Sequence, residues 1–146
     1  MTDSRIRIDF YVLPATDTGA RLKFTCRLTE KVYQLQHRIH AHTASSGQAR
    51  ELDELLWTFR QGSFLPHALS VSATDDPVPI TIGFDEPTGI DGDLLINLAD
   101  AIPSFFDRFT RIAEIIDGTQ ESRRLGRERF GFYRDNGYKP NTHNIS

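Results

Sequence analysis

The segment Leu94 to Leu98 is a nearly continuous apolar run. A strand of this composition is buried on both faces, as in a parallel sheet that is covered by helices. Residues 112–116 predict another strand, and the alternation of Ile80, Ile82 and Phe84 predicts a half-buried one. The chain therefore requires helical layers around a central sheet.

The first strand and helix are expected near the N-terminus. Residues 9–13 are rich in β-forming side chains and stop at Pro14, which is typical of a short strand. Residues 20–36 then repeat apolar side chains at helical spacing and predict an amphipathic helix. The expected core face of this helix carries Phe24, Leu28, Val32 and Leu35.

A second strand and helix follow in the same order. Residues 37–44 are expected to be extended, and the cluster at residues 43–47 supplies a turn and an N-cap. The helix that follows is expected to end between residues 60 and 62. Its core stripe carries Leu52, Leu55, Leu56 and Phe59.

The second half of the chain continues the alternation. Three prolines place residues 63–79 in a loop, residues 103–109 predict a brief helix, and residues 119–136 predict a final helix closed by Gly137. This order is typical of an α/β fold with a mostly parallel sheet and helices on both faces. We expect a single three-layer domain over residues 1–146, Rossmann-like but without a phosphate loop. The order of the strands cannot be read from one sequence.

Cysteine usage and hydropathy indicate the compartment. Cys26 is the only cysteine, which excludes an intramolecular disulfide and a zinc site built from several cysteines. We interpret it as a small buried residue of the first helix. No signal-like or membrane-spanning apolar run is present, so we expect a cytoplasmic protein.

The motifs that would mark an enzyme are missing. Residues 14–19, the turn after the first strand, contain one glycine and match neither dinucleotide-binding nor P-loop patterns. His40 and His42 would share one face of a strand, but no third metal ligand is placed beside them. No nucleophile elbow occurs, and the acid pairs lie in turns. The sequence therefore predicts no catalytic residues, metal or cofactor.

Two non-catalytic features stand out. The helix that carries Trp57 leads into a loop with Phe64, which offers large apolar area to a partner unless both rings are core. The last helix is basic: residues 119–146 carry six Lys and Arg against three acids, a net charge of +3, while the whole chain has −3. A basic end on an acidic body indicates a negatively charged partner.

The basic residues of the last helix form a ridge. At 100° per residue, Arg123, Arg127 and Arg134 fall within about 40° of one another with Phe130 at their border. Leu125 and Phe132 lie roughly opposite, and we expect the helix to dock through them. Arginine beside an aromatic ring suits a carboxylate attached to an apolar side chain.

Two other functions stay open on the residues alone. The first is a small nucleotide-binding enzyme or regulator of the same fold class, with a phosphate site of unfamiliar type. The second is direct binding of single-stranded nucleic acid through the C-terminal arginines. One basic ridge without several interleaved aromatics makes this second function the weaker one.

Several short motifs occur in a fixed order along the chain. They are Phe10-Tyr11, Leu52-Asp53-Glu54 with Trp57, Ser63-Phe64 with Pro66-His67, Leu94 to Leu98, and Arg127-Glu128-Arg129 with Tyr133-Arg134. In order and spacing they make the chain resemble the chi subunit of the bacterial DNA polymerase III holoenzyme over nearly its whole length.

The resemblance implies a non-catalytic accessory subunit of the clamp-loader assembly in DNA replication. Such a subunit pairs with the psi subunit, grips the C-terminal tail of single-stranded DNA-binding protein, and meets nucleic acid only indirectly. Arg127 is implied as the chief contact to the tail, with Arg123 and Phe130 beside it. Phe64, together with Trp57, is implied in the surface for psi or for a helicase that competes with psi.

The chain departs from the family pattern at a few positions. Phe130 and Gly131 stand where members show Tyr and Lys, so a hydroxyl and one positive charge are lost. This implies weaker tail binding but not its absence. His40 and His42 stand where apolar residues are expected in the second strand.

Overall fold

Strands and helices alternate along the chain in the computed structural model, which describes residues 6–62, 64–69, 78–85 and 92–145. The strands are β1 (Arg7–Val12), β2 (Ile39–His42), β3 (His67–Leu69), β4 (Ile80–Gly83), β5 (Gly92–Asn97), β6 (Phe109–Ile116) and β7 (Asn141–Asn144). The helices are α1 (Ala20–Tyr33), α2 (Ser46–Thr58) and α3 (Gln120–Asp135), with a 3-10 turn η2 (Phe106–Arg108) before β6. Within these ranges no helix is long and apolar enough to cross a bilayer.

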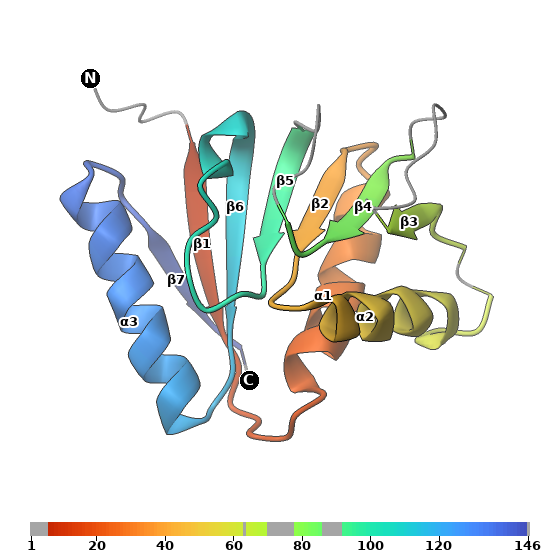
Figure 1. Ribbon diagram of the computed structural model, residues 1–146, viewed down its shortest axis with the longest axis horizontal. Helices are drawn as coiled ribbons and strands as arrows, with labels where there is room; N and C mark the ends of the chain where they lie inside the picture. Colours follow the sequence, from red (N-terminus) through yellow and green to blue (C-terminus); the bar gives the residue numbers. More distant parts are fainter. Residues whose placement is uncertain (1–5, 63, 70–77, 86–91, 146) are drawn as a thin grey trace.

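The strands of the described residues form one seven-stranded sheet in the order β3-β4-β2-β5-β6-β1-β7 (Figure 1). Every neighbouring pair is parallel. The predicted α/β class with a mostly parallel sheet is therefore confirmed. β3 and β7, which the sequence did not predict, are the two edge strands.

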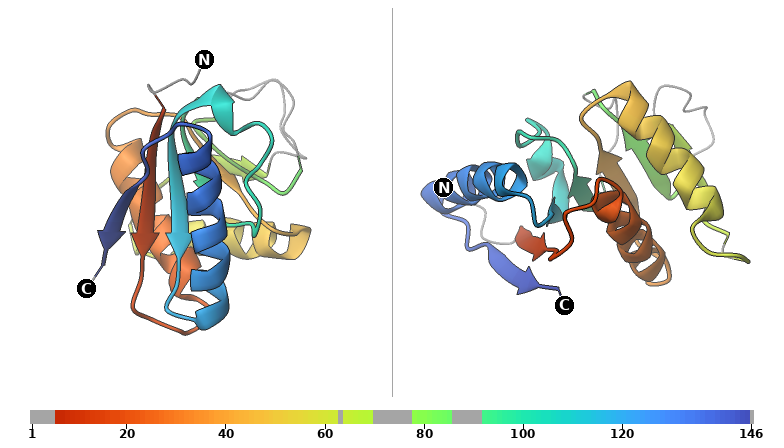
Figure 2. Two further views of the ribbon diagram at one scale, coloured as in Figure 1. Left: turned by 90° about the vertical axis from the view of Figure 1, so that its left-hand side faces the viewer. Right: turned by 90° about the horizontal axis from the view of Figure 1, so that it is seen from below.

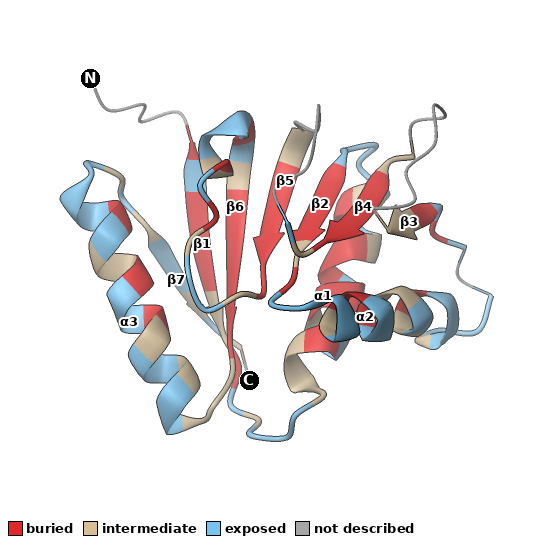
Figure 3. Ribbon diagram, viewed as in Figure 1, coloured by how far each residue is buried: buried red, intermediate tan, exposed pale blue. Residues whose placement is uncertain are grey.

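Helices cover both faces of the sheet, which confirms the three-layer arrangement. α1 and α2 share one hydrophobic core with a row formed by Ala41, Ile82, Ile96 and Ala113. α3 and the segment that leads into β6 cover the opposite face, as Figure 2 shows. All four residues of β4 are buried, so the expectation of a half-buried strand was wrong (Figure 3).

The helix ends follow the expected capping chemistry. The Ser45 hydroxyl accepts a hydrogen bond from the backbone N–H of Gln48, and Thr119 does the same for Ser122. Gly137 follows α3 with a φ of 89°, a conformation that glycine adopts without strain. The core face predicted for the first helix was wrong at Leu35, which is exposed because α1 ends at Tyr33. Cys26 is fully buried, as expected.

Candidate functional site

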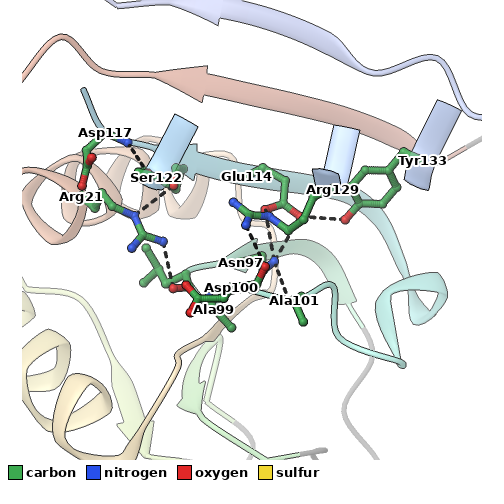
Figure 4. Close-up of polar contacts among 12 residues, drawn as sticks. Arg21, Asn97, Ala99, Asp100, Ala101, Glu114, Asp117, Ser122, Arg129 and Tyr133 are labelled. Atoms are coloured by element: carbon green, nitrogen blue, oxygen red, sulfur yellow. Dashed lines mark hydrogen bonds and ion pairs between the residues drawn. The ribbon is translucent and has the colours of Figure 1, made fainter. Parts of the chain in front are cut away.

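A buried polar network attaches α3 to the sheet (Figure 4). Glu114, on β6, is fully buried and accepts hydrogen bonds from the Arg129 Nε at 2.8 Å and the Tyr133 hydroxyl at 2.8 Å. Asn97, on β5, donates to both carboxylate oxygens at 3.1 Å. Burial raises the pKa of Glu114, and the contacts with Arg129, Asn97 and Tyr133 oppose this increase.

The same network corrects the predicted orientation of α3. The helix docks through Gly126, Arg129 and Tyr133, which are its buried residues. Leu125 is only partly buried and Phe132 is 44% exposed, so the expectation that these two residues would form the docking face was wrong. The physical reason is that Arg129, counted as solvated in a hydrophobic pattern, is neutralised inside the protein by Glu114.

Gly126 lets α3 approach the sheet closely. A Cβ at this position would lie 2.7 Å from Ile116 Cδ1, nearer than side chains normally pack. An open trough with a volume of about 270 Å³ lies beside the helix. Its lining comes from three sides: Phe10, Val12 and Ile116 from the sheet, Arg123, Gly126, Arg127 and Phe130 from α3, and Thr142 and Asn144 from β7.

The structure thus brings Arg123, Arg127 and Phe130 to one cavity. Phe130 is partly buried, and its ring packs against Phe10 with centroids 5.2 Å apart, so the floor of the trough is apolar. Arg123 and Arg127 are exposed, and neither forms an ion pair with a described residue. Arg134, which the helical projection grouped with them, is not among the trough-lining residues.

The charge on α3 is therefore distributed unequally around the helix. Arg124 is held by Glu121 at 2.6 Å and by Glu128 at 3.1 Å, so its charge is compensated. The positive charges beside the trough have no such acidic partner within the described part of the chain. An aromatic floor under free guanidinium groups suits a carboxylate on an apolar group, since guanidinium donates two parallel hydrogen bonds.

Sequence reasoning missed the second wall of the trough. Thr142 and Asn144 belong to β7, whose sequence Asn-Thr-His-Asn has no apolar residue to mark a strand. Pro140, immediately before it, was the available signal of a new segment. β7 pairs with β1, and its His143 donates from Nε2 to the buried Asp9 at 2.9 Å.

A second exposed feature lies near the other edge of the sheet, on α2 and the segment before β3. Trp57 is 51% exposed and Phe64 is 81% exposed, which excludes the core interpretation of both rings. Their centroids lie 6.0 Å apart in an edge-to-face arrangement. We refer to Trp57 and Phe64 together as the aromatic pair. A cavity of about 320 Å³ lies next to Phe64, between α1 and the end of α2.

The two histidines of β2 are part of the packing on the α3 face of the sheet. His40 is fully buried, lies 2.7 Å from the Thr81 hydroxyl through Nδ1, and contacts the rings of Phe105 and Phe109. Burial, with a smaller effect of His42, lowers the pKa of His40 to about 4, so the ring is neutral at neutral pH. Among the described residues no group of three or more metal-ligating side chains occurs.

The carboxyl edge of the sheet, where similar folds bind phosphate, holds a pocket of about 190 Å³ whose lining includes the acidic residues Asp100, Asp117 and Glu121. The β1–α1 and β6–α3 loops meet there, and a Cβ at Gly118 would lie 2.4 Å from the Pro14 oxygen. Arg21 donates to the carbonyl oxygens of Ile115 at 3.0 Å and Leu98 at 2.8 Å. At the start of α3, the Asp117 carboxylate accepts from the N–H of Thr119 at 2.8 Å. A negative group at this helix end disfavours a phosphate.

The comparison with known proteins decides the family. The family model for the DNA polymerase III chi subunit, HolC, matches residues 6–141. The chain belongs to the DNA polymerase III chi subunit family. It is similar to the DNA polymerase III subunit chi of Pseudomonas aeruginosa, with 40% identity over 95% of this chain and 96% of the relative. The Escherichia coli K12 subunit of the same name is 27% identical over 91% of this chain and 94% of the relative.

Proposed function

We propose that this subunit of DNA polymerase III is non-catalytic and connects two protein partners. The first is an acidic peptide with a C-terminal aromatic residue, as in the tail of single-stranded DNA-binding protein. The second is the psi subunit, or a helicase that competes with it. The observation that carries the proposal is that the guanidinium groups of Arg123 and Arg127 lie above the apolar floor of the trough and form no ion pair with a described residue.

The trough suggests one orientation for the peptide. The terminal side chain would lie on the floor beside Phe130, and Arg127 would donate two hydrogen bonds to the terminal carboxylate. Arg123, one turn earlier, would attract the upstream acids. On the other wall, Thr142 and Asn144 offer uncharged polar groups to the peptide backbone.

Titration of a labelled acidic peptide that ends in phenylalanine tests this site. Arg127→Ala should lower the affinity about 10- to 150-fold, because a charge-assisted hydrogen bond contributes about 1.5–3 kcal/mol. Amidation of the peptide's C-terminus should lower its affinity for the wild-type protein by a similar factor. The same amidation should have little further effect on binding to Arg127→Ala. Binding should also weaken toward 1 M salt, where the Debye length is about 3 Å.

Arg124→Ala is the matched control for this experiment. It removes an arginine from the same helix, but one that Glu121 and Glu128 already neutralise. Its effect on peptide affinity should therefore be small. If Arg124→Ala weakens binding as much as Arg127→Ala, net charge governs the interaction and the proposed carboxylate contact is rejected.

The second partner is assigned to the aromatic pair. An exposed Trp and Phe in edge-to-face contact have the composition of a binding hot spot, so Phe64→Ala should weaken a psi-type partner by about 2 kcal/mol or more. Thermal stability should change little, since Phe64 is 81% exposed. Phe132→Ala, an exposed aromatic on α3, is the matched control and should leave this interaction unchanged. If Phe64→Ala binds the psi-type partner as tightly as wild type, the aromatic pair is not the surface for this partner.

The packing at the carboxyl edge supports a non-catalytic role. Acidic side chains line the pocket at this edge, and Arg21 already donates to main-chain oxygens, so both features disfavour a nucleotide phosphate there. A thermal-shift screen with ATP, GTP and NAD should show no stabilisation. A reproducible increase in the melting temperature with any of them would support the nucleotide-dependent alternative instead.

A further inference from the structure

His67 lies beneath the aromatic pair, and both of its ring nitrogens face oxygen acceptors. Nδ1 lies 2.6 Å from the main-chain oxygen of Leu65. Nε2 lies 3.1 Å from the main-chain oxygen of Asp53 and 3.3 Å from its Oδ1. The His67 side chain is fully buried, so water does not replace either contact. A neutral imidazole carries one N–H, whereas the imidazolium carries two and satisfies both nitrogens.

The charged groups around the ring are compatible with this state. Asp53 of α2 supplies a carboxylate against Nε2. Arg60, two residues after the end of α2, forms an ion pair with Glu30 of α1 at 3.2 Å, which compensates its charge. On the sheet side, His67 pairs in register with the apolar Ile80 of β4. Among the described residues, Asp53 is therefore the charged partner of the imidazolium.

The ring also supports Trp57. The centroids of Trp57 and His67 lie 4.3 Å apart, and Trp57 in turn contacts Phe64. Asp53 and Trp57 are one helical turn apart on α2, while Leu65 and His67 belong to the segment that follows Phe64. His67 thus connects the helix that carries one exposed ring to the segment that carries the other.

We propose that His67, in its doubly protonated form, is the positioning residue that fastens the Phe64 segment to α2 and holds the aromatic pair in place. Loss of one proton removes one of the two contacts and turns a nitrogen lone pair toward an oxygen acceptor, so the pair loosens in the neutral form. The importance of His67 for partner binding rests on the proposed function. The protonation state of its ring is independent of that function.

The state of the ring can be observed directly. In a long-range ¹H–¹⁵N spectrum of the wild-type chain at about pH 6, both His67 nitrogens should show the shifts of protonated nitrogens. Trp57, the only tryptophan, provides a second reading because an adjacent imidazolium quenches indole emission. Its fluorescence should therefore rise as the imidazolium loses a proton in wild type, and stay bright and constant in His67→Gln.

The positioning role is tested by the contact between the two aromatic rings. Proton contacts (NOEs) between Trp57 and Phe64 should be lost in His67→Gln and should weaken in wild type as the fluorescence rises. His143→Gln, which removes another histidine with a carboxylate partner, is the control and should keep them. The wild-type titration needs no variant, so it stands even if His67→Gln does not fold.

A His67 ring with one protonated nitrogen at about pH 6, or a Trp57–Phe64 contact that persists when the ring is neutral, overturns the proposal. Neither reading uses a partner. If Phe64→Ala fails to weaken a psi-type partner, the proposed function fails while these results are unaffected.

Discussion

Arg129→Met should destabilise the protein strongly, because it leaves Glu114 without its cationic partner. The two charges lie 2.8 Å apart with side-chain exposures of 6% and 0%. Removing one member of a buried pair costs about 3–5 kcal/mol, a large part of the total of about 5–15 kcal/mol for a domain. At roughly 2–4 °C per kcal/mol for a chain of this size, the melting temperature should fall by about 6–20 °C.

Urea unfolding at several pH values measures this loss and tests its cause. The pKa of Glu114 is already raised by burial, and removing Arg129 should raise it further. A carboxyl group whose folded pKa lies above the unfolded value favours the folded state more at low pH, and this contribution is lost as the pH rises through the folded pKa. The deficit of Arg129→Met should therefore be largest near neutral pH and shrink toward about pH 5.

The double variant Arg129→Met with Glu114→Gln separates the charge from the packing. The amide can still accept from Tyr133 and Asn97, so stability should return to within about 1–2 kcal/mol of wild type. A single variant that loses less than about 1 kcal/mol, or a double variant as unstable as the single one, would refute the reasoning that an unpaired buried charge causes the loss.

Three further outcomes are expected. Gly126→Ala should cost about 1–3 kcal/mol in urea unfolding, since its methyl group would meet Ile116. Gly131→Ala should stabilise α3 slightly, because its Cβ would make only an ordinary contact with the Arg134 side chain at 3.8 Å. Burial raises the pKa of Cys26 to about 12, so a thiol reagent at neutral pH should modify it only at the rate of unfolding. Phe64→Ala should leave tail-peptide affinity at the wild-type value, because the two sites share no residue.

The fold followed from patterns that depend on local chemistry. Apolar periodicity located the first two long helices and the central strands. The turn cluster that contains Ser45 indicated the start of α2, and Gly137 indicated the end of α3. The edge strands β3 and β7 are three and four residues long. Their sequences carry little alternation, because an edge strand is held by backbone pairing with one neighbour and needs little apolar surface.

The orientation of α3 shows where sequence reasoning failed. The predicted docking face of Leu125 and Phe132 was wrong, because Arg129, which the helical projection did not place, is buried against the sheet instead. The orientation of the helix depends on a non-local contact, since the partner of Arg129 is Glu114, which lies within a largely apolar strand. Arg123, Arg127 and Phe130 nevertheless came together, because residues three and four apart share a helix face whichever side of the helix docks.

The sheet separates the two proposed binding sites, so that two partners can bind without interference. The trough lies between α3 and β7 at one edge, and the aromatic pair lies on α2 and the segment before β3 near the other. Between them stand β4, β2 and β5, whose residues are largely buried and close-packed, and such packing resists small deformations. A bound peptide at α3 therefore has no hinge through which to move α2. The subunit would connect two partners simply by binding both at the same time. The sheet permits this because it keeps the two sites apart.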